Sequence, residues 1–174
     1  IVYNFTEVSM KRCDYISWDE YFMGVALLAA RRSKDPNTQV GACIVNESKK
    51  IMSIGYNGLP IGCSDDEFPW EREGENSYET KYPYVCHAEL NAILNNRGTS
   101  LEGCSIYVAL FPCCECAKAI IQSGIKKVLY ISDKYGKSDS VRSSKRMFDA
   151  AGVKYEQIRI DHKKIEIDFS ENLI

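Results

Sequence analysis

The chain of 174 residues carries a formal net charge of −2, with 45% hydrophobic and 26% charged residues. This length and composition suit one globular domain with its own core and leave little room for two. A protein that tracks a nucleic-acid backbone carries an excess of basic residues, so this charge favours a small anionic substrate over a polymer.

The N-terminal segment shows neither a signal-peptide pattern nor a membrane span. It lacks a basic start followed by an apolar run, and no stretch of the chain approaches the roughly 20 apolar residues that would span a bilayer. We expect residues 1–12 to be an N-terminal extension, with Met10 as an alternative start, and residues 13–174 to form one domain.

The chain has eight cysteines. Cys43 and Cys104 lie in apolar runs, where a free thiol behaves as a small buried hydrophobic group. We therefore interpret the cysteines as free thiols of a reducing compartment, the cytoplasm or the nucleus.

The first half of the domain predicts a helix followed by a β-hairpin. Ser17 and Glu20 are spaced as a capping box, and apolar residues at helical spacing extend this helix to about Arg32. Two β-rich runs joined by a short polar turn, 40–46 and 51–56, predict the hairpin.

A segment of about 28 residues without regular pattern follows Gly58, and segments of this kind are functional or disordered. Its aromatic residues argue against plain disorder. We therefore expect a packed, functional insertion, on the basis of Phe68, Trp70, Tyr78, Tyr82 and Tyr84.

The second half alternates helices and strands. The helices are predicted from His87 onward, at 114–123 and at 140–151, and the strands at 104–110, 127–132 and 153–160. Gly124 and Gly152 follow the last two helices, as is usual past a helix C-terminus.

This alternation requires crossover connections and parallel strands. The predicted class is therefore α/β, a single three-layer domain with a mixed β-sheet of about five strands flanked by helices. In the C-terminal tail, Ile165, Ile167 and Phe169 alternate with polar residues and predict a last strand or a strip packed on the body.

Two short motifs carry the chemistry. His87-Ala88-Glu89 opens one predicted helix, and Pro112-Cys113-Cys114-Glu115-Cys116 opens the next. Together they match the H-x-E…P-C-x-x-C signature of zinc deaminases that act on nucleobases.

The residue types fit a catalytic zinc site. His87, Cys113 and Cys116 supply an imidazole and two thiolates for a tetrahedral Zn²⁺, and three protein ligands leave its fourth position open. Water in that position has a pKa of about 7, so hydroxide is available at neutral pH. Glu89 is then the catalytic residue that moves protons between water and the ring.

Other interpretations of each half of the pattern exist. A C-x-x-C pair alone also occurs in redox sites and in zinc fingers, and Cys86 or Cys114 is close enough in sequence to be a fourth ligand. A redox pair, however, would not explain His-Ala-Glu at the preceding helix start. Cys86 adjoins His87, and Cys114 lies between the two proposed ligands, pointing away on a helix.

Four longer segments resemble the deoxycytidylate (dCMP) deaminases, namely 33–45, 55–66, 81–94 and 107–128. The resemblance covers nearly the whole chain after about Cys13. It implies a cytidine-deaminase-like fold and hydrolysis of dCMP to dUMP and ammonia, which supplies thymidylate synthesis.

The resemblance also implies site residues. Asn57 would contact the sugar, although it also fits a turn before Gly58, and backbone groups of Ala88 and around Leu110 and Phe111 would read the cytosine edge. The candidates for the 5′-phosphate, which also fit a solvated helix end and loop, are Arg32, Ser33, Lys34 and Tyr135.

Regulation is likewise implied by resemblance alone. It comprises a homohexamer, activation by dCTP, inhibition by dTTP, and Mg²⁺ accompanying the effector. Effector contacts are expected at Asn57, Gly58, Gly62 and Asp65. Some phage members of the family bind a second zinc in the long loop, but here that loop offers Cys63 and little else, so we expect one zinc per chain.

Three rival functions share part of this pattern. A polynucleotide deaminase would need a basic groove, a nucleoside deaminase would need no phosphate clamp, and a zinc-bearing interaction module would have no use for Glu89. We therefore expect a nucleotide substrate, with neither a nucleic-acid polymer nor a membrane as partner.

Overall fold

The computed structural model describes residues 11–170. The predicted extension at 1–12, including Met10, therefore lies almost entirely outside the described residues. The elements in chain order are α1 (Trp18–Ala30), β1 (Gly41–Val45), β2 (Ile51–Tyr56), the 3₁₀ turn η1 (Ser77–Glu79), α2 (Ala88–Asn95), β3 (Ser105–Leu110), α3 (Cys114–Gln122), β4 (Lys127–Ser132), α4 (Asp139–Ala151) and β5 (Lys154–Gln157).

The five strands form one mixed sheet in the order β2-β1-β3-β4-β5. β1 runs antiparallel to both β2 and β3, whereas β3, β4 and β5 are mutually parallel. The parallel pairs are joined through α3 and α4, as crossover connections require. The predicted α/β class with a mixed five-stranded sheet is confirmed.

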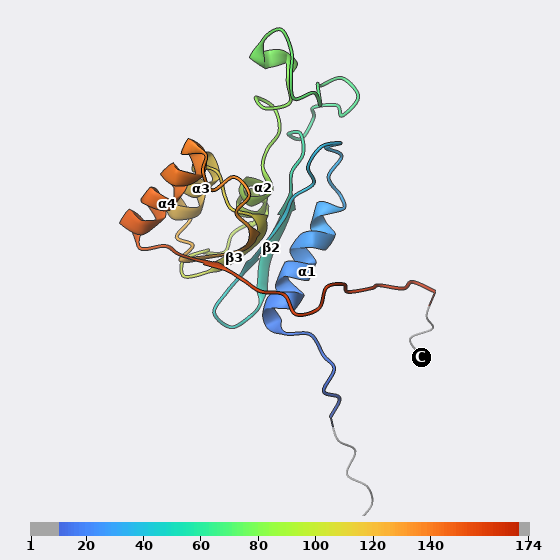
Figure 1. Ribbon diagram of the computed structural model, residues 1–174, viewed down its shortest axis with the longest axis vertical. Coiled ribbons are helices and arrows are strands. Elements are labelled where there is room, and N and C mark those ends of the chain that lie inside the picture. The colour runs from blue at the N-terminus through green and yellow to red at the C-terminus, as the bar shows by residue number, and fades with distance from the viewer. Residues whose placement is uncertain (1–10, 171–174) are drawn as a thin grey trace, which may run out of the picture.

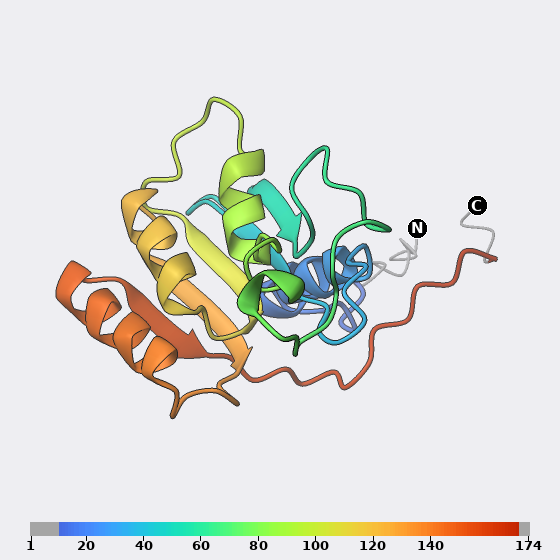
Figure 2. The same ribbon diagram turned by 90° about the horizontal axis from the view of Figure 1, so that it is seen from above.

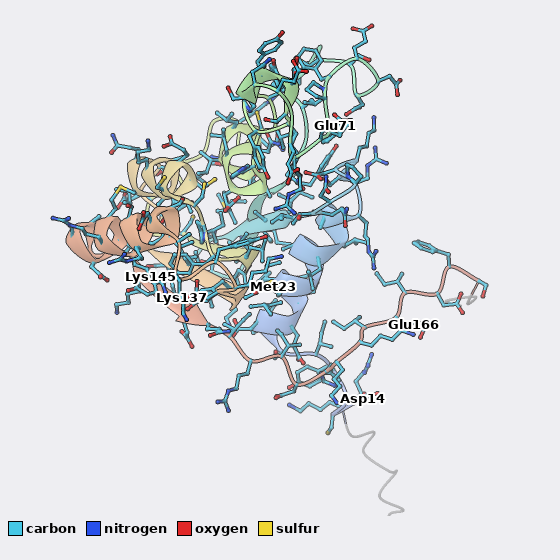
Figure 3. All side chains as sticks on the ribbon, turned by 45° about the horizontal axis from the view of Figure 1, so that its top comes forward. Asp14, Met23, Glu71, Lys137, Lys145 and Glu166 are labelled. Carbon is cyan, nitrogen blue, oxygen red and sulfur yellow. The ribbon has the colours of Figure 1, made fainter. Side chains whose placement is uncertain are left out.

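Helices cover both faces of the sheet. α1 lies on one face, and α2, α3 and α4 lie on the other (Figures 1 and 2). Alternate residues of β1 serve the two cores: Ala42 and Ile44 pack with the α2–α4 layer, and Cys43 and Val45 pack with α1. Met23 of α1 belongs to this second core and lies between helix and sheet (Figure 3).

Two glycines let helices approach the sheet closely. A Cβ added to Gly55 of β2 would overlap backbone atoms of Ala88 and Ala92 in α2. A Cβ on Gly41 of β1 would overlap the backbone of Ala26 in α1. The first of these contacts fixes the start of α2, where two residues of the H-x-E motif lie.

The long segment between β2 and α2, which contains Glu71, projects beyond the end of the sheet (Figures 1 and 3). It is packed on itself and on the α1–β1 connection. Trp70 Nε1 donates to Asp65 O at 2.9 Å, and Asn37 Nδ2 donates to Trp70 O at 3.2 Å. The expectation of a packed insertion agrees with these contacts.

Of the two alternatives predicted for residues 165–169, a last strand or a strip packed on the body, the strand is wrong. The described part of the tail contains no strand, and Ile167 and Phe169 are 56% and 95% exposed. After β5 the chain instead contacts the start of α1. Glu20 Oε1 at the start of α1 accepts from His162 N at 3.0 Å and lies 2.6 Å from His162 Nδ1. The tail thus leaves the sheet and crosses α1 (Figure 1).

No helix among residues 11–170 combines the length and the apolar character that a membrane crossing demands. All eight cysteines of the sequence lie in this range and are free thiols.

Candidate active site

The ends of two helices bring the motif residues together. His87 is the N-cap of α2 and Cys113 is the N-cap of α3, and both have extended backbone. Neither side chain caps its own helix, so both remain available for another partner. The β3–α3 connection that carries Cys113 is held by a hydrogen bond from Phe111 N to Ser132 O at 2.9 Å.

Three potential ligand atoms converge at these helix ends. His87 Nδ1 lies 3.4 Å from Cys113 Sγ and 3.4 Å from Cys116 Sγ, and all three atoms lie within 4.8 Å of one another. A tetrahedral zinc at its usual bond lengths would hold sulfur and nitrogen about 3.6 Å apart. The residues therefore fit a zinc ion, and among residues 11–170 they are the one His/Cys/Asp/Glu group of this kind.

The pKa values of these three residues are shifted in different directions. A hydrogen bond with Cys116, aided by His87 and opposed by burial, lowers the pKa of Cys113 to about 3. The contact with Cys113 raises the pKa of His87 to about 9, and the same network raises the pKa of Cys116. A cation that binds here would displace the shared protons, as is usual for thiolate sites.

Glu89 lies beside this group, on the first turn of α2, and is only 5% exposed. Burial raises the pKa of its carboxyl group, and the neighbouring His87 partly opposes that shift. A raised pKa makes a carboxyl group better suited both to take up and to release a proton.

A cavity of about 350 Å³ opens over these residues, at the small end of the range for ligand sites. It is lined by Asp35, Thr38, Val40, Asn57, Arg72, Lys81, Tyr82, Val85, His87, Ala88, Glu89, Leu110, Phe111, Cys113 and Tyr135. The structure thus gathers five residues that the sequence placed at the substrate, Asn57, Ala88, Leu110, Phe111 and Tyr135, around the motif residues.

Three phosphate candidates lie elsewhere. Arg32 is exposed beyond the end of α1 and does not line the cavity. Ser33 Oγ accepts from Asp35 N at 3.3 Å, and Lys34 forms an ion pair with Asp65. The helix end therefore interacts with the long loop instead of with the cavity.

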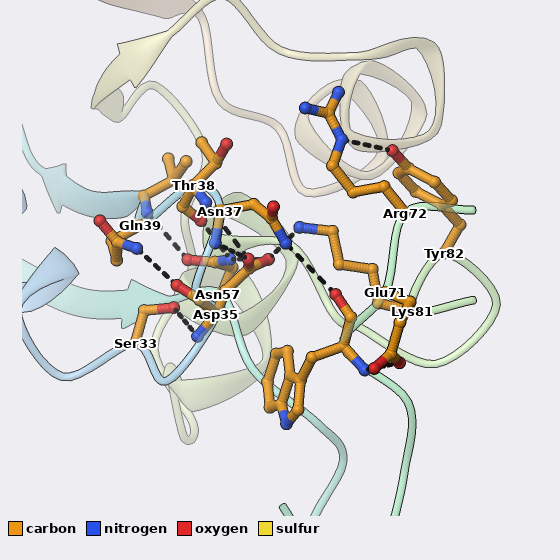
Figure 4. A network of polar contacts seen from close by, with 12 residues as sticks. Ser33, Asp35, Asn37, Thr38, Gln39, Asn57, Glu71, Arg72, Lys81 and Tyr82 are labelled. Carbon is orange, nitrogen blue, oxygen red and sulfur yellow. Dashed lines mark hydrogen bonds and ion pairs between the residues drawn. The ribbon is translucent and has the colours of Figure 1, made fainter. Parts of the chain in front are cut away.

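Asn57 makes several contacts within the protein. Its Oδ1 accepts from Val40 N at 2.8 Å, and its Nδ2 donates to Thr38 O at 3.0 Å and to Asp35 Oδ2 at 3.4 Å (Figure 4). Both amide hydrogens are used, which leaves one lone pair of Oδ1 for a ligand. Asn57 thus shapes the cavity wall by holding the α1–β1 connection.

A buried ion pair that the sequence did not suggest lies next to Asn57. Lys81 Nζ is 2.5 Å from Asp35 Oδ2, and both side chains are almost wholly buried (Figure 4). Asp35 Oδ1 accepts from the backbone N–H groups of Asn37 and Thr38 at 2.8 and 3.2 Å. Burial disfavours the ionised form of Asp35, but the hydrogen bond from Lys81, together with those from the two backbone N–H groups, outweighs it and lowers the pKa of the carboxyl group.

The candidate effector residues lie in the first part of the long loop, directly after β2. Gly58 exchanges backbone hydrogen bonds of 3.1 and 2.9 Å with Cys86, next to His87. Gly62 occupies an exposed position with a φ of +91°, and Asp65 pairs with Lys34. The loop thus connects the end of α1 with the start of α2.

The fold and this site define a class of protein. An imidazole and two thiols at the starts of two helices, a buried glutamate beside them and an open cavity above form the arrangement of zinc-dependent nucleobase deaminases.

Comparison with known proteins gives the family. Residues 16–132 match the family described as "Cytidine and deoxycytidylate deaminase zinc-binding region". The chain belongs to this family. It is 61% identical to the deoxycytidylate deaminase of Homo sapiens over 94% of this chain and 93% of that protein, and 37% identical to ComE operon protein 2 of Bacillus subtilis over 91% and 80%.

A solved structure agrees with both the fold and the family. The dCMP deaminase of cyanophage S-TIM5, in complex with dCMP and dUMP, aligns with a TM-score of 0.63 and 27% identity. The alignment covers 80% of this chain and 95% of the phage chain.

Proposed function

We propose that this protein hydrolyses dCMP to dUMP and ammonia. The observation that carries the proposal is one cavity lined by His87, Cys113 and Glu89 together with polar and aromatic side chains, with Cys116 in the same potential metal-binding group. The relatives named deoxycytidylate deaminase and the cyanophage complex with dCMP and dUMP support this substrate.

The chemistry requires water to add at C4 of cytosine and the C4–N bond to break. A zinc ion held by His87, Cys113 and Cys116 would supply the Lewis acidity that lowers the pKa of water to about 7. Glu89 accepts the proton of the attacking water and delivers it to the ring nitrogen, and a later proton transfer lets ammonia depart. The balance is one water consumed, one ammonia released.

The cavity walls would position the base. Ala88, Leu110 and Phe111 line the cavity, so their backbone groups would bond the edge of the cytosine, and Asn57 would use its remaining lone pair for the sugar hydroxyl. Burial raises the pKa of Glu89, which suits a carboxyl group that must both accept and release a proton.

We extend the proposal to regulation and cellular role on the ground of family resemblance. The protein would supply dUMP for thymidylate synthesis in the cytoplasm, be activated by dCTP with Mg²⁺, be inhibited by dTTP, and assemble as a homohexamer. Effector contacts at Asn57, Gly58, Gly62 and Asp65 would act on the zinc site through the Gly58–Cys86 bridge, which adjoins His87.

A substrate panel tests the proposal. Deamination rates are measured for dCMP, deoxycytidine and a short deoxycytidine oligonucleotide, each with and without dCTP–Mg²⁺ and dTTP. We expect dCMP to have the highest kcat/KM, with opposite effects of the two effectors. A preference for deoxycytidine or for the oligonucleotide would overturn the substrate assignment, and rates unaffected by either effector would overturn the regulation.

A further inference from the structure

Two cationic side chains, Arg72 and Lys81, line the cavity, and they differ in their partners. Lys81 is buried and neutralised by Asp35, as described above. Arg72 lines the same cavity, and within residues 11–170 no carboxylate lies within ion-pair distance of its guanidinium. Of the two cations that line the cavity, Lys81 has an acidic partner and Arg72 has none among the described residues.

The orientation of Arg72 is set by Tyr82. Arg72 Nε donates to Tyr82 Oη at 3.2 Å. In Figure 4 Lys81 lies between this pair and Asp35. This bond is the guanidinium's one side-chain hydrogen bond within the described residues, so both terminal nitrogens remain available as a pair. Because Tyr82 Oη accepts from Nε, its own proton is free to donate to another group.

A backbone hydrogen bond between their neighbours holds these two residues in place. Lys81 N donates to Glu71 O at 3.0 Å, so the residues that follow each of them, Tyr82 and Arg72, lie side by side. The Lys81–Asp35 ion pair ties this contact to the α1–β1 connection. Asn37 Nδ2 adds a second tie through Trp70 O. The guanidinium is thus attached to an anchored part of the long loop.

A pair of parallel guanidinium N–H groups matches two oxygens of a phosphate, and hydroxyl donors complete such a site. Tyr135, which enters the cavity from the β4–α4 connection, supplies a further hydroxyl on the lining. We propose that Arg72, oriented by Tyr82, binds the 5′-phosphate of the substrate and makes the enzyme select a nucleotide over a nucleoside. This inference rests on the proposed function. It assigns the phosphate to Arg72 and not to the candidates at the end of α1, Arg32, Ser33 and Lys34.

The test compares dCMP with deoxycytidine in Arg72→Gln. We expect kcat/KM for dCMP to fall about 10- to 100-fold, as for the loss of a hydrogen-bonded charge, mostly through a higher KM. The value for deoxycytidine should stay within about twofold of wild type, since that substrate has no phosphate to lose. Arg72→Lys should restore part of the loss, and Tyr82→Phe should show a smaller loss with the same selectivity.

Two controls separate binding from structure. Arg97→Gln changes an exposed arginine outside the cavity and should leave both substrates unaffected. Calorimetry with the product provides a readout that is independent of turnover: Arg72→Gln should weaken dUMP and leave deoxyuridine unchanged.

Each other outcome contradicts the assignment. Equal losses on dCMP and deoxycytidine would make Arg72 a structural residue, and no loss would exclude it from the phosphate site. A selective loss in Arg32→Gln with Arg72→Gln unaffected would move the phosphate to the end of α1. Wild-type protein that fails to deaminate dCMP would refute the proposed function itself, which distinguishes that failure from a failure of Arg72 alone.

Discussion

Glu89 combines burial with a position beside the three potential zinc ligands. It is too close to His87 in sequence to share its direct coordination comfortably, since His87 is the N-cap of α2 and residues two positions apart at a helix start do not face each other. Its raised pKa comes mainly from loss of solvent. We infer that this carboxyl group transfers protons and is not a metal ligand.

Glu89→Gln tests this role at the residue scale. The amide keeps the shape of the side chain but cannot accept a proton, so turnover of dCMP should fall about 10²- to 10⁴-fold while zinc content is unchanged. Steady-state kinetics and metal analysis of the same sample check both. Glu115→Gln, an exposed acid of α3 paired with Lys118, is the matched control and should keep its activity. Turnover that survives Glu89→Gln would refute the proton-transfer role.

Asp35→Ala tests the buried ion pair. Removing one partner leaves Lys81 charged and buried, so the free energy of unfolding should fall by about 3–5 kcal/mol. Adding Lys81→Met should recover much of that loss because no unpaired charge remains. Urea unfolding of the two single variants and the double variant gives the coupling between the residues. Strictly additive losses would show that the pair does not act as a unit.

The sequence predicted the potential zinc ligands but not the buried ion pair, because only the former are close together in local motifs. The spacings H-x-E and C-x-x-C at helix starts fix local geometry, so the grouping of His87, Cys113 and Cys116 was predictable. Asp35 and Lys81 meet across 46 positions of sequence. The long loop has no sequence periodicity, so its sequence does not indicate which of its cationic side chains is buried at the cavity.

At the scale of elements, the start of α1 is joined to the C-terminal tail through Glu20. Backbone N–H groups of Ser17 and then His162, together with the His162 ring, lower the pKa of Glu20 to about 2. A folded pKa below the ordinary value of 4.5 means that this contribution to stability is present above about pH 4.5 and is lost as the pH falls toward 2.

Glu20→Gln measures that contribution. The variant should be less stable than wild type at about pH 5.5, and the difference should shrink at about pH 3, where wild-type Glu20 begins to bind a proton. Urea unfolding at the two pH values provides the comparison. A difference of the same size at both would show that the charge of Glu20 does not stabilise this junction.

The close packing of α2 on β2 makes a second prediction about elements. Gly55→Ala should lower the free energy of unfolding by about 1–3 kcal/mol or more, because the added Cβ meets helix backbone that cannot move aside locally. Gly24→Ala in α1 is the control: its Cβ would make an ordinary 3.7 Å contact with Ile165, so stability should rise by about 0.5–1 kcal/mol. Gly55→Ala as stable as wild type would contradict the packing described.

At the scale of the whole molecule, the alternation of helices and strands predicted the class and the mixed sheet. It did not predict that β1 lies between β2 and β3, since strand order depends on contacts far apart in sequence. The tail shows the same limit. Ile165, Ile167 and Phe169 alternate as a strand would, but the Glu20–His162 contact leads the chain past α1.

The central claim is that one zinc, held by His87, Cys113 and Cys116, supports hydrolysis of dCMP. The most direct measurement is a titration of metal-free protein with Zn²⁺, with dUMP and ammonia formation from dCMP as the readout. Our account predicts that both products appear in equal amounts and that the rate rises to a plateau at one zinc per chain. Turnover without zinc, or a plateau reached only at two zinc ions per chain, would contradict it.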